Sequence, residues 1–356
     1  MPEVVERLVV FLPNWVGDAV MFTPALRAIR ARFGPARLAL AGRAAPLAAL
    51  APCPWADETI RDAGSVLALA RALRRGRFDL AVLGPNSFRS ALAARLAGAK
   101  RRVGYARDGR GWLLTDRLEA PRAADGSWAK TPALDYYLEL AGYLGCETGD
   151  KRMELSVSAG DAAAAEELLT GAGADRARPI VLLNPGASFG ASKMYPPGRF
   201  AAVADALIQR RGAQIIINAA PDEGEVAGAV ERAMNESPLV NLAAVANSLG
   251  LLKALVARSK LMITNDTGPR HFAAALGVPV VTIFGATDPD WTTIYYERER
   301  IVRVRVSCGP CQRKTCRLPE GPKKHQCMLK IPPEMVLAAA EELLDHRSEA
   351  SGSEPS

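Results

Sequence analysis

Two kinds of segment alternate along the chain. Short runs of aliphatic and β-branched residues, such as RLVVFLP and PIVLLNPG, are typical of buried strands. Alanine- and leucine-rich runs with apolar residues at helical spacing, such as DAVMFTPALRAIRARF and GRFAAVADALIQRRG, follow them after short turns. Strands that alternate with helices in this way predict an α/β fold, in which helices cover both faces of a parallel sheet.

This alternation occurs twice. The predicted strands span residues 7–13, 36–42, 58–62, 78–84 and 100–106 in the first series, and 179–186, 213–220, 239–243, 260–266 and 279–285 in the second. A helix over residues 161–173, with Asp161 expected as its N-cap, opens the second series. We therefore predict two α/β domains, residues 1–160 and 161–347. The polar composition of residues 348–356 predicts a disordered tail.

Composition narrows the class of partner. With 356 residues, 49% of them hydrophobic, the chain can bury two cores, and its formal net charge of +7 favours an anionic partner. Aromatic residues make up 6% and do not interleave with the basic ones, so we expect no specific nucleic-acid partner. Small groups of basic residues are typical of solvated surface, but they could also contact phosphorylated lipid headgroups. These groups are Arg71, Arg74, Arg75 and Arg77, then Lys100, Arg101 and Arg102, then Arg107 and Arg110.

The chain carries no sign of membrane insertion or secretion. No apolar run reaches the roughly 18–20 residues that span a bilayer. The start MPEVVERLVVFLP has an acidic flank and a short apolar run, which resembles a first strand more than a secretion signal. We expect a cytoplasmic protein.

Ligands of parallel sheets bind at the carboxyl ends of the strands, and a cleft between two such domains is the expected site. Three unusual loops follow predicted strands. In the first, residues 13–30, Gly17 permits a tight turn and Asp18 stands at the start of a helix. Asp18 could cap that helix, as aspartate commonly does, or it could serve as a general base.

The second loop, residues 184–200, has two glycines, small residues and Lys193. Small residues allow close backbone approach, and an amine suits a diphosphate, although a loop lysine is usually solvated. The phosphate-binding pattern G-x-x-x-x-G-K-[ST] is missing, and so is G-x-G-x-x-G, which argues against a nicotinamide cofactor.

The third loop, NDTGPRH, follows KLMI. Thr267 and Gly268 precede the helix RHFAAALG, whose free N–H groups and dipole suit an anion. Asp266 would repel a phosphate unless it accepts hydrogen bonds from the loop or from a sugar hydroxyl. His271 could donate a hydrogen bond to a phosphate. The alternative is a capped helix with a core histidine.

Four of the six cysteines cluster as C-G-P-C-x4-C-x10-C, namely Cys308, Cys311, Cys316 and Cys327. Thiolates at such spacing can build a tetrahedral zinc or iron site, and a structural metal would order this polar, Pro- and Gly-rich segment. The alternative is four free thiols in a flexible loop.

Together the loops resemble the ADP-heptose:lipopolysaccharide heptosyltransferases, glycosyltransferase family 9. The resemblance rests on NWVGDAVMFTPALRAIR, NPGASFGASKMYPPGRF and NDTGPRHFAAALGVPVVTIFGATDP, and it extends to about residue 345. PNWVGD is most similar to the heptosyltransferase II branch. The resemblance implies a GT-B fold, two Rossmann-like domains facing an interdomain cleft. It places the acceptor on the amino-terminal domain and the nucleotide sugar on the carboxyl-terminal domain.

The resemblance also implies roles for single residues. It makes Asp18 the general base and Lys193 a donor-phosphate contact, and it assigns the family's D-[ST]-G loop to Asp266, Thr267 and Gly268. His271 matches the family histidine. Relatives carry glycine-glycine-proline before an acid where this chain has NAAPDE, so we place the ribose contact on Glu223, with Asp222 as its rival. This departure leaves nucleotide selectivity open.

The resulting hypothesis is an inverting heptosyltransferase. It would use ADP-heptose as donor and a lipid-linked lipopolysaccharide inner-core saccharide as acceptor, without a catalytic cofactor or metal, in peripheral contact with the inner membrane. A structural zinc or iron ion in residues 308–327 agrees with similar four-cysteine insertions in some family members. The alternatives are transfer of a related sugar, transfer to a protein, and a non-catalytic sugar-nucleotide-binding protein.

Overall fold

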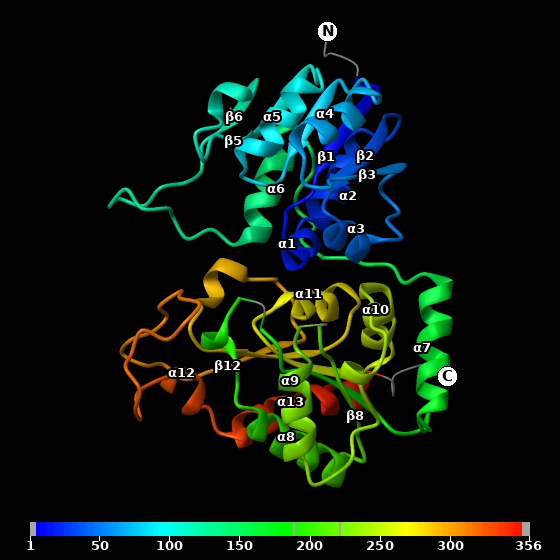
Figure 1. The fold of residues 1–356 in the computed structure, drawn as a ribbon, viewed down its shortest axis with the longest axis vertical. Coiled ribbons are helices and arrows are strands. Elements are labelled where there is room, and N and C mark those ends of the chain that lie inside the picture. Colours follow the sequence, from blue (N-terminus) through cyan, green and yellow to red (C-terminus); the bar gives the residue numbers. More distant parts are fainter. Residues whose placement is uncertain (1–4, 188, 221, 351–356) are drawn as a thin grey trace. The chain divides into compact units, whose positions relative to one another are not determined.

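The computed structural model describes residues 5–187, 189–220 and 222–350, with side chains to residue 345 in the last helix. The chain divides into two compact units (Figure 1). The first comprises Met1–Ser156 and Asp290–Tyr295, and the second comprises Val157–Pro289 and Tyr296–Ser356. The sequence placed a boundary at residue 160 and did not anticipate the return of Asp290–Tyr295 to the first unit. The expected cleft between the domains stays a prediction.

The first unit is built on a six-stranded parallel sheet in the order β3-β2-β1-β4-β5-β6. Its strands are β1 Arg7–Phe11, β2 Arg37–Gly42, β3 Glu58–Arg61, β4 Leu80–Leu83, β5 Arg101–Tyr105 and β6 Asp116–Leu118. The helices of this unit are α1 Val16–Met21, α2 Thr23–Arg32, α3 Ala44–Leu50, α4 Val66–Arg74, α5 Phe88–Leu96 and α6 Ala133–Tyr143. The strand order reverses at β1, so the loops after β1 and β4 begin side by side.

The second unit repeats this plan with the order β12-β11-β10-β7-β8-β9. Its strands are β7 Ile180–Asn184, β8 Gln214–Ile217, β9 Val240–Asn241, β10 Leu261–Asn265, β11 Val280–Phe284 and β12 Glu299–Arg303. Its helices are α7 Ala159–Gly171, α8 Pro197–Arg211, α9 Gly224–Ala233, α10 Leu249–Arg258, α11 Gly268–Ala275, α12 Gln326–Leu329 and α13 Pro333–Ala350. Here the order reverses between β7 and β10, so their loops are neighbours.

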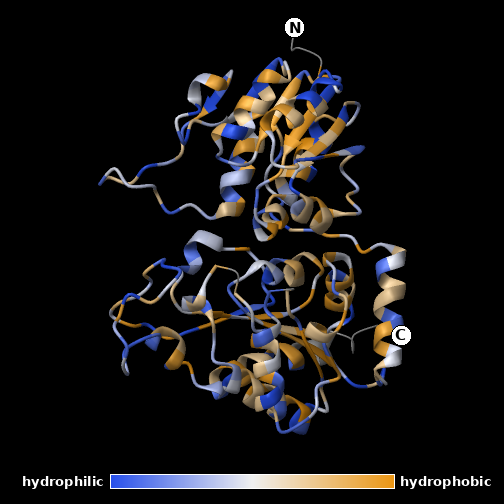
Figure 2. Cartoon of the chain, viewed as in Figure 1, coloured by the Kyte–Doolittle hydropathy of each residue, from blue (hydrophilic) through white to orange (hydrophobic). Residues whose placement is uncertain are grey.

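Burial explains why the strands read as continuous apolar runs. Every residue of β7, β8, β10 and β11 is buried, because helices pack against these central strands. Figure 2 shows the same distribution, with hydrophobic strands inside each unit and hydrophilic residues on the outer helix faces. The predicted α/β fold is confirmed.

Two terminal details differ from the prediction. Helix α7 begins at Ala159, and its N-cap is Ser158 rather than Asp161. The Ser158 hydroxyl accepts a hydrogen bond from Asp161 N (3.0 Å), because the helix begins two residues before Asp161 and places Asp161 inside its first turn. Of the tail expected to be disordered, residues 348–350 are the last turn of α13, which corrects the prediction there. Residues 351–356 lie outside the described residues.

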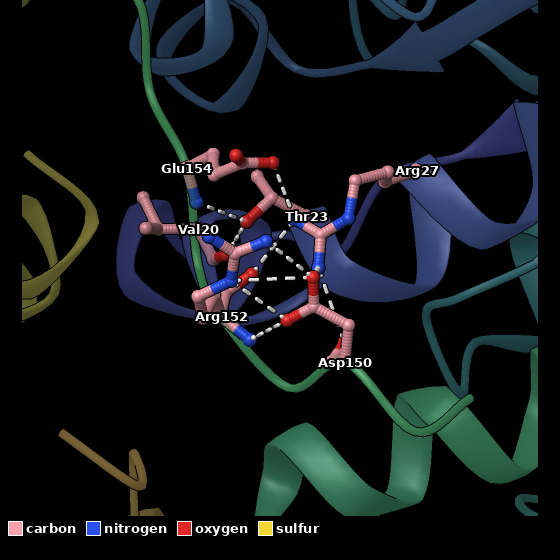
Figure 3. A network of polar contacts seen from close by, with 6 residues as sticks. All are labelled: Val20, Thr23, Arg27, Asp150, Arg152 and Glu154. Carbon is pink, nitrogen blue, oxygen red and sulfur yellow. Dashed lines mark hydrogen bonds and ion pairs between the residues drawn. The ribbon is translucent and has the colours of Figure 1, made fainter.

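The segment that leaves the first unit is anchored to α2 (Figure 3). The Arg27 guanidinium donates to the backbone oxygens of Arg152 (2.9 Å) and Asp150 (3.1 Å), and it pairs with the carboxylates of Asp150 and Glu154. Thr23 joins the same network: its hydroxyl donates to Val20 O (2.7 Å) and accepts from Glu154 N (3.1 Å). The end of α1 is therefore tied to residues 150–154.

Candidate active site

Asp18 lies in α1, directly after the loop that follows β1 at the reversal of the first sheet. The N-cap of α1 is Trp15, and no side chain caps the helix, so the interpretation of Asp18 as a capping residue is wrong. Although partly exposed, the carboxyl is surrounded by enough protein that burial raises its pKa from 3.8 to about 6. A carboxyl with this pKa is ionised at neutral pH and basic enough to take a proton.

Lys193 and Asp266 meet at the reversal of the second sheet. Lys193 ends a short 3-10 helix, Ala191–Lys193, in the loop after β7, and Asp266 follows β10. The Lys193 ammonium donates to Asp266 Oδ2 (2.5 Å) and to the Asp266 backbone oxygen (2.9 Å). Both residues are buried. The structure thus joins two loops that are 73 positions apart in the sequence.

The Asp266 carboxylate is held by three partners. Besides Lys193, the Thr287 hydroxyl donates to Oδ2 (2.7 Å), and Arg270 Nη1 lies 3.6 Å from Oδ1. Burial alone would raise the pKa of Asp266, but the charges of Lys193 and Arg270 and these hydrogen bonds outweigh it and lower the pKa. Asp266 is therefore a fixed anion that organises the loop.

Arg270 is itself oriented by a second buried acid. It is fully buried, and its Nε and Nη2 donate to the two oxygens of Glu299 on β12, at 2.6 and 2.9 Å. The Thr282 hydroxyl donates to the same carboxylate (2.6 Å). This two-point contact fixes the guanidinium beside Asp266. Sequence reasoning passed over Arg270, Thr282, Thr287 and Glu299, because these residues look ordinary until the strands are paired.

Thr267 is the N-cap of α11, and Gly268 is its first residue. The Thr267 hydroxyl accepts a hydrogen bond from Asn184 Nδ2 (3.0 Å), not from the helix backbone. Because Pro269 has no N–H group and no side chain caps the helix, the N–H groups of the first turn are the donors that an anion at this helix start would use. The site residues Lys193, Asp266, Thr267 and Gly268 therefore lie together in the second unit.

Asparagines at the ends of adjacent strands support this arrangement. Asn184 Oδ1 accepts from Asn218 Nδ2 (2.6 Å), which links β7 to the loop after β8. Asn265 Nδ2 donates to the backbone oxygens of Pro185 (2.8 Å) and Gly186 (3.2 Å), which ties the end of β10 to the loop after β7. Asparagine as the last residue of two buried strands was the available signal, and sequence reasoning missed it.

His271 lies in the first turns of α11 and is buried. Burial, and then the charge of Arg270, lower its pKa to about 3, so the ring is neutral at physiological pH. Among the described residues, no hydrogen-bond partner contacts its buried Nδ1. The structure therefore places His271 as a buried, neutral histidine, and its contact with a phosphate stays a prediction.

Glu223 and Asp222 differ in their surroundings. Glu223 is the N-cap residue of α9, and its carboxylate accepts a hydrogen bond from Ala220 N (3.3 Å). A Cβ atom at Gly186 would lie 2.0 Å from Glu223 Oε2, so this glycine is what admits the carboxylate to the loop after β7. Asp222 is exposed. The geometry favours Glu223 over Asp222 as a residue near the site, while its ribose contact stays a prediction.

A family model now places the chain. Residues 66–321 match the model of glycosyltransferase family 9 (heptosyltransferase). The chain belongs to glycosyltransferase family 9. It is 28% identical to lipopolysaccharide heptosyltransferase 2 of Salmonella typhimurium over 95% of this chain and 98% of the relative.

Solved structures agree with this family assignment. The structure of the E. coli ADP-heptose LPS heptosyltransferase II superposes with a TM-score of 0.77 at 28% identity, covering 96% of this chain and 99% of that one. A family 9 glycosyltransferase of Veillonella parvula superposes with a TM-score of 0.81 at 23% identity, over 96% of this chain and 97% of that one. The chain is therefore a glycosyltransferase, and the predicted GT-B fold is confirmed. No helix in the described part of the chain is long and apolar enough to span a bilayer.

The Cys-rich segment of this glycosyltransferase folds around one small cavity. Cys308, Cys311, Cys316 and Cys327 all line it and are all free thiols. Within the described residues, however, no group of three or more His, Cys, Asp or Glu side chains could hold a metal ion. The structure gives no support to the predicted zinc or iron site, because clustering of thiols alone does not supply ligand geometry.

This segment instead braces the site loops. Cys311 N and Gln312 N both donate to Ala286 O (3.0 and 2.9 Å), after β11. Ser192, the residue before Lys193, donates its N–H to Lys314 O (3.1 Å). Gly190, at φ 146°, passes so close that a Cβ atom would lie 2.5 Å from Lys314 O. The four thiols are free, as the alternative predicted, but the segment that carries them is hydrogen-bonded to two candidate-site loops.

Proposed function

We propose that this glycosyltransferase transfers heptose from ADP-heptose to a lipid-linked saccharide of the lipopolysaccharide inner core, with inversion at the anomeric carbon. The observation that carries the donor assignment is the buried Lys193–Asp266 contact at the amino terminus of α11. An ammonium and a helix start together offer what a diphosphate needs. The donor would lie on the second unit and the acceptor on the first.

Asp18 would act as the general base. Its carboxylate would take the proton of the acceptor hydroxyl while that oxygen bonds to the anomeric carbon of the donor. The bond from this carbon to the ADP oxygen breaks at the same time, and ADP leaves with the electron pair. Attack from the face opposite the leaving group inverts the configuration. A pKa of about 6 supports this role, because a more acidic carboxylate would be a weaker base.

The relatives support this donor and acceptor. The superposed E. coli enzyme is named an ADP-heptose LPS heptosyltransferase II, and the Salmonella relative a lipopolysaccharide heptosyltransferase. We infer the same donor and acceptor class for this chain, with a cytoplasmic location and peripheral contact with the inner membrane.

Calorimetry with ADP, UDP, GDP and NAD tests the donor. Selective binding of ADP agrees with the proposal, and preference for UDP or NAD contradicts it. Incubation with ADP-heptose and heptose-deficient lipopolysaccharide tests the reaction, and the anomeric configuration of the product tests inversion. ADP binding without turnover on any acceptor would contradict the transfer that we propose.

The proposed reaction needs no metal. A structural zinc or iron ion at the four cysteines stays a prediction, and metal analysis of the purified protein tests it. About one equivalent of zinc or iron that disappears in Cys311→Ser would support it, given the tetrahedral sites such thiolates form. Metal-free protein with four reactive thiols would contradict it.

A further inference from the structure

The first unit has a strongly basic stretch that the proposed reaction does not use. Residues 63–107 contain ten basic side chains and one acid, Asp79. That acid already pairs with Lys100 (2.8 Å). Asp62, just before the stretch, pairs with Arg89, and Asp116, in β6, pairs with Arg101. These three acids are therefore neutralised, and the remaining arginines outnumber Asp108, which directly follows the stretch, so the net charge is positive.

Part of this charge gathers on the outer face of α4 and α5, which pack side by side (Figure 1). Arg71 and Arg74 lie one turn apart on α4, and Arg74 Nη2 donates to Leu96 O at the end of α5 (2.7 Å). Arg95 lies beside Leu96. No ion pair involves Arg71, Arg74 or Arg95 within the described residues.

Large apolar side chains are exposed on the same face. Trp112 is 58% exposed, Phe88 42% and Leu96 37%. The Trp112 ring lies 5.9 Å from the Phe88 ring, and the Arg95 guanidinium lies 5.9 Å from the Trp112 ring. Leu67, one turn before Arg71 on α4, is 62% exposed. Aromatic rings, leucines and arginines thus alternate over one surface.

Trp112 is held outward by its neighbours. It belongs to the short helix Gly111–Leu113. The two residues that follow Trp112, Leu113 and Leu114, are buried in the core. Arg102 Nε fixes this helix by donating to Leu113 O (2.7 Å). The exposed ring is therefore presented by a rigid support rather than by a loose loop.

We propose that the surface formed by Arg71, Arg74, Phe88, Arg95, Leu96 and Trp112 docks on an anionic lipid bilayer. Arginines attract anionic headgroups, while tryptophan, phenylalanine and leucine favour the boundary between headgroups and acyl chains. Apolar area and positive charge combined on one face are what peripheral membrane binding requires. A nucleic-acid partner is disfavoured, because no motif for one accompanies the charge.

This surface belongs to the unit that carries Asp18, so docking would bring that unit to the membrane. Phe88 begins α5 immediately after the β4 loop, and β4 pairs with β1, whose loop leads to Asp18. Docking through α4 and α5 would hold the first unit at a membrane that carries a lipid-linked acceptor, with the Phe88 end of α5 nearest the strand ends that lead to Asp18. This last point rests on the proposed function, while the binding of lipid does not.

Vesicle co-sedimentation of the full chain tests the proposal. We expect binding to phosphatidylcholine vesicles that contain phosphatidylglycerol, weak binding to phosphatidylcholine alone, and release by salt. The double variant Arg71→Gln/Arg95→Gln should lower the partition coefficient about tenfold or more, because each arginine near an anionic surface contributes. Trp112→Ala should lower it as well, by removing an interfacial anchor.

Matched controls remove equal charge or apolar area elsewhere. Arg117→Gln/Arg232→Gln takes two exposed arginines from β6 and α9, and Met335→Ala shortens an exposed apolar side chain on α13. Equal loss of binding in surface and control variants would overturn the proposal, as would wild-type protein that ignores anionic vesicles. Surface variants that change the oligomeric state, or that lose affinity for delipidated acceptor saccharide, would overturn it in favour of a self-contact or an acceptor subsite. Vesicle binding is measured without a sugar donor. The result therefore tests the membrane proposal even if the protein shows no heptosyl transfer.

Discussion

Lys193 Nζ lies 2.5 Å from Asp266 Oδ2, and both side chains are buried between the loops that follow β7 and β10. This ion pair joins the two halves of the proposed diphosphate site. Removing one partner of a buried pair is costly, because the charge that remains has no water and fewer partners.

Replacement of Lys193 by methionine should therefore damage both stability and binding. We expect the free energy of unfolding to fall by about 3 kcal/mol, because the buried Asp266 carboxylate loses its nearest cation and keeps only Arg270, 3.6 Å away, and the Thr287 hydroxyl. ADP affinity should fall as well. Urea unfolding and calorimetry measure the two effects. Lys100→Met is the control: its pair with Asp79 is exposed on the lysine side, so the loss should stay within about 1 kcal/mol. Similar losses in both variants would contradict the role of burial.

Asp18→Asn should separate catalysis from donor binding. Turnover should fall about 10²- to 10⁴-fold, because the variant lacks the group that takes the acceptor proton, while ADP affinity stays unchanged. In the wild type, kcat/KM should fall as the pH drops below about 6, where the Asp18 carboxyl becomes protonated. Unchanged turnover in the variant, or an acid limb far from this pH, would contradict the assignment.

The raised pKa of Asp18 also predicts how the free energy of unfolding depends on pH. Its pKa is raised from 3.8 to about 6 in the folded protein, so the folded state holds its proton more tightly than the unfolded state. The destabilisation is absent below the lower pKa and complete above the higher one, where it reaches about 3 kcal/mol. Asp18→Asn should therefore stabilise the protein near pH 8 and have little effect near pH 4, as measured by urea unfolding.

His271 should lower the free energy of unfolding as the pH falls, which is opposite to the effect of Asp18. Its folded pKa of about 3 lies below the ordinary value of 6.5, so the unfolded state takes up a proton first as the pH falls. Between about pH 8 and pH 5 this effect should remove about 2 kcal/mol of unfolding free energy from the wild type. The difference between wild type and His271→Gln should show it, since the variant lacks the titrating ring. A difference that does not vary with pH would mean that the pKa of His271 is the same in the folded and unfolded states, which would contradict the prediction.

Gly190→Ala should disturb the support of the Lys193 loop. The residue has φ 146°, and an added Cβ would meet Lys314 O at 2.5 Å. We expect a loss of about 1–3 kcal/mol and weaker ADP binding, because the strain lies three residues before Lys193. In Gly198→Ala an added Cβ meets nothing within 4 Å, so stability should be unchanged or rise by about 0.4–1 kcal/mol. Equal effects would show that the Cys-rich segment does not brace this loop.

The sequence predicted the two sheets because buried parallel strands read as apolar runs whatever their neighbours. It also marked the loops of Asp18, Lys193 and NDTGPRH, because polar and glycine residues after a buried strand are conspicuous. It could not exclude that Asp18 caps its helix, because only the structure shows that Trp15 is the N-cap. Its N-cap assignment at Asp161 failed for a similar reason, since Ser158 competes for the same N–H groups.

Local pattern therefore determined the fold class, the repeated α/β plan and the loops in which chemistry lies. Tertiary structure alone decided which side chains meet: Lys193 with Asp266, Arg270 with Glu299, and the Cys-rich segment with the loop before Lys193. Contacts of this kind join residues far apart along the chain, and strand order rather than sequence distance brings them together. Charge, burial and pKa at the site follow from that order, because an ionisable group responds to its surroundings in space.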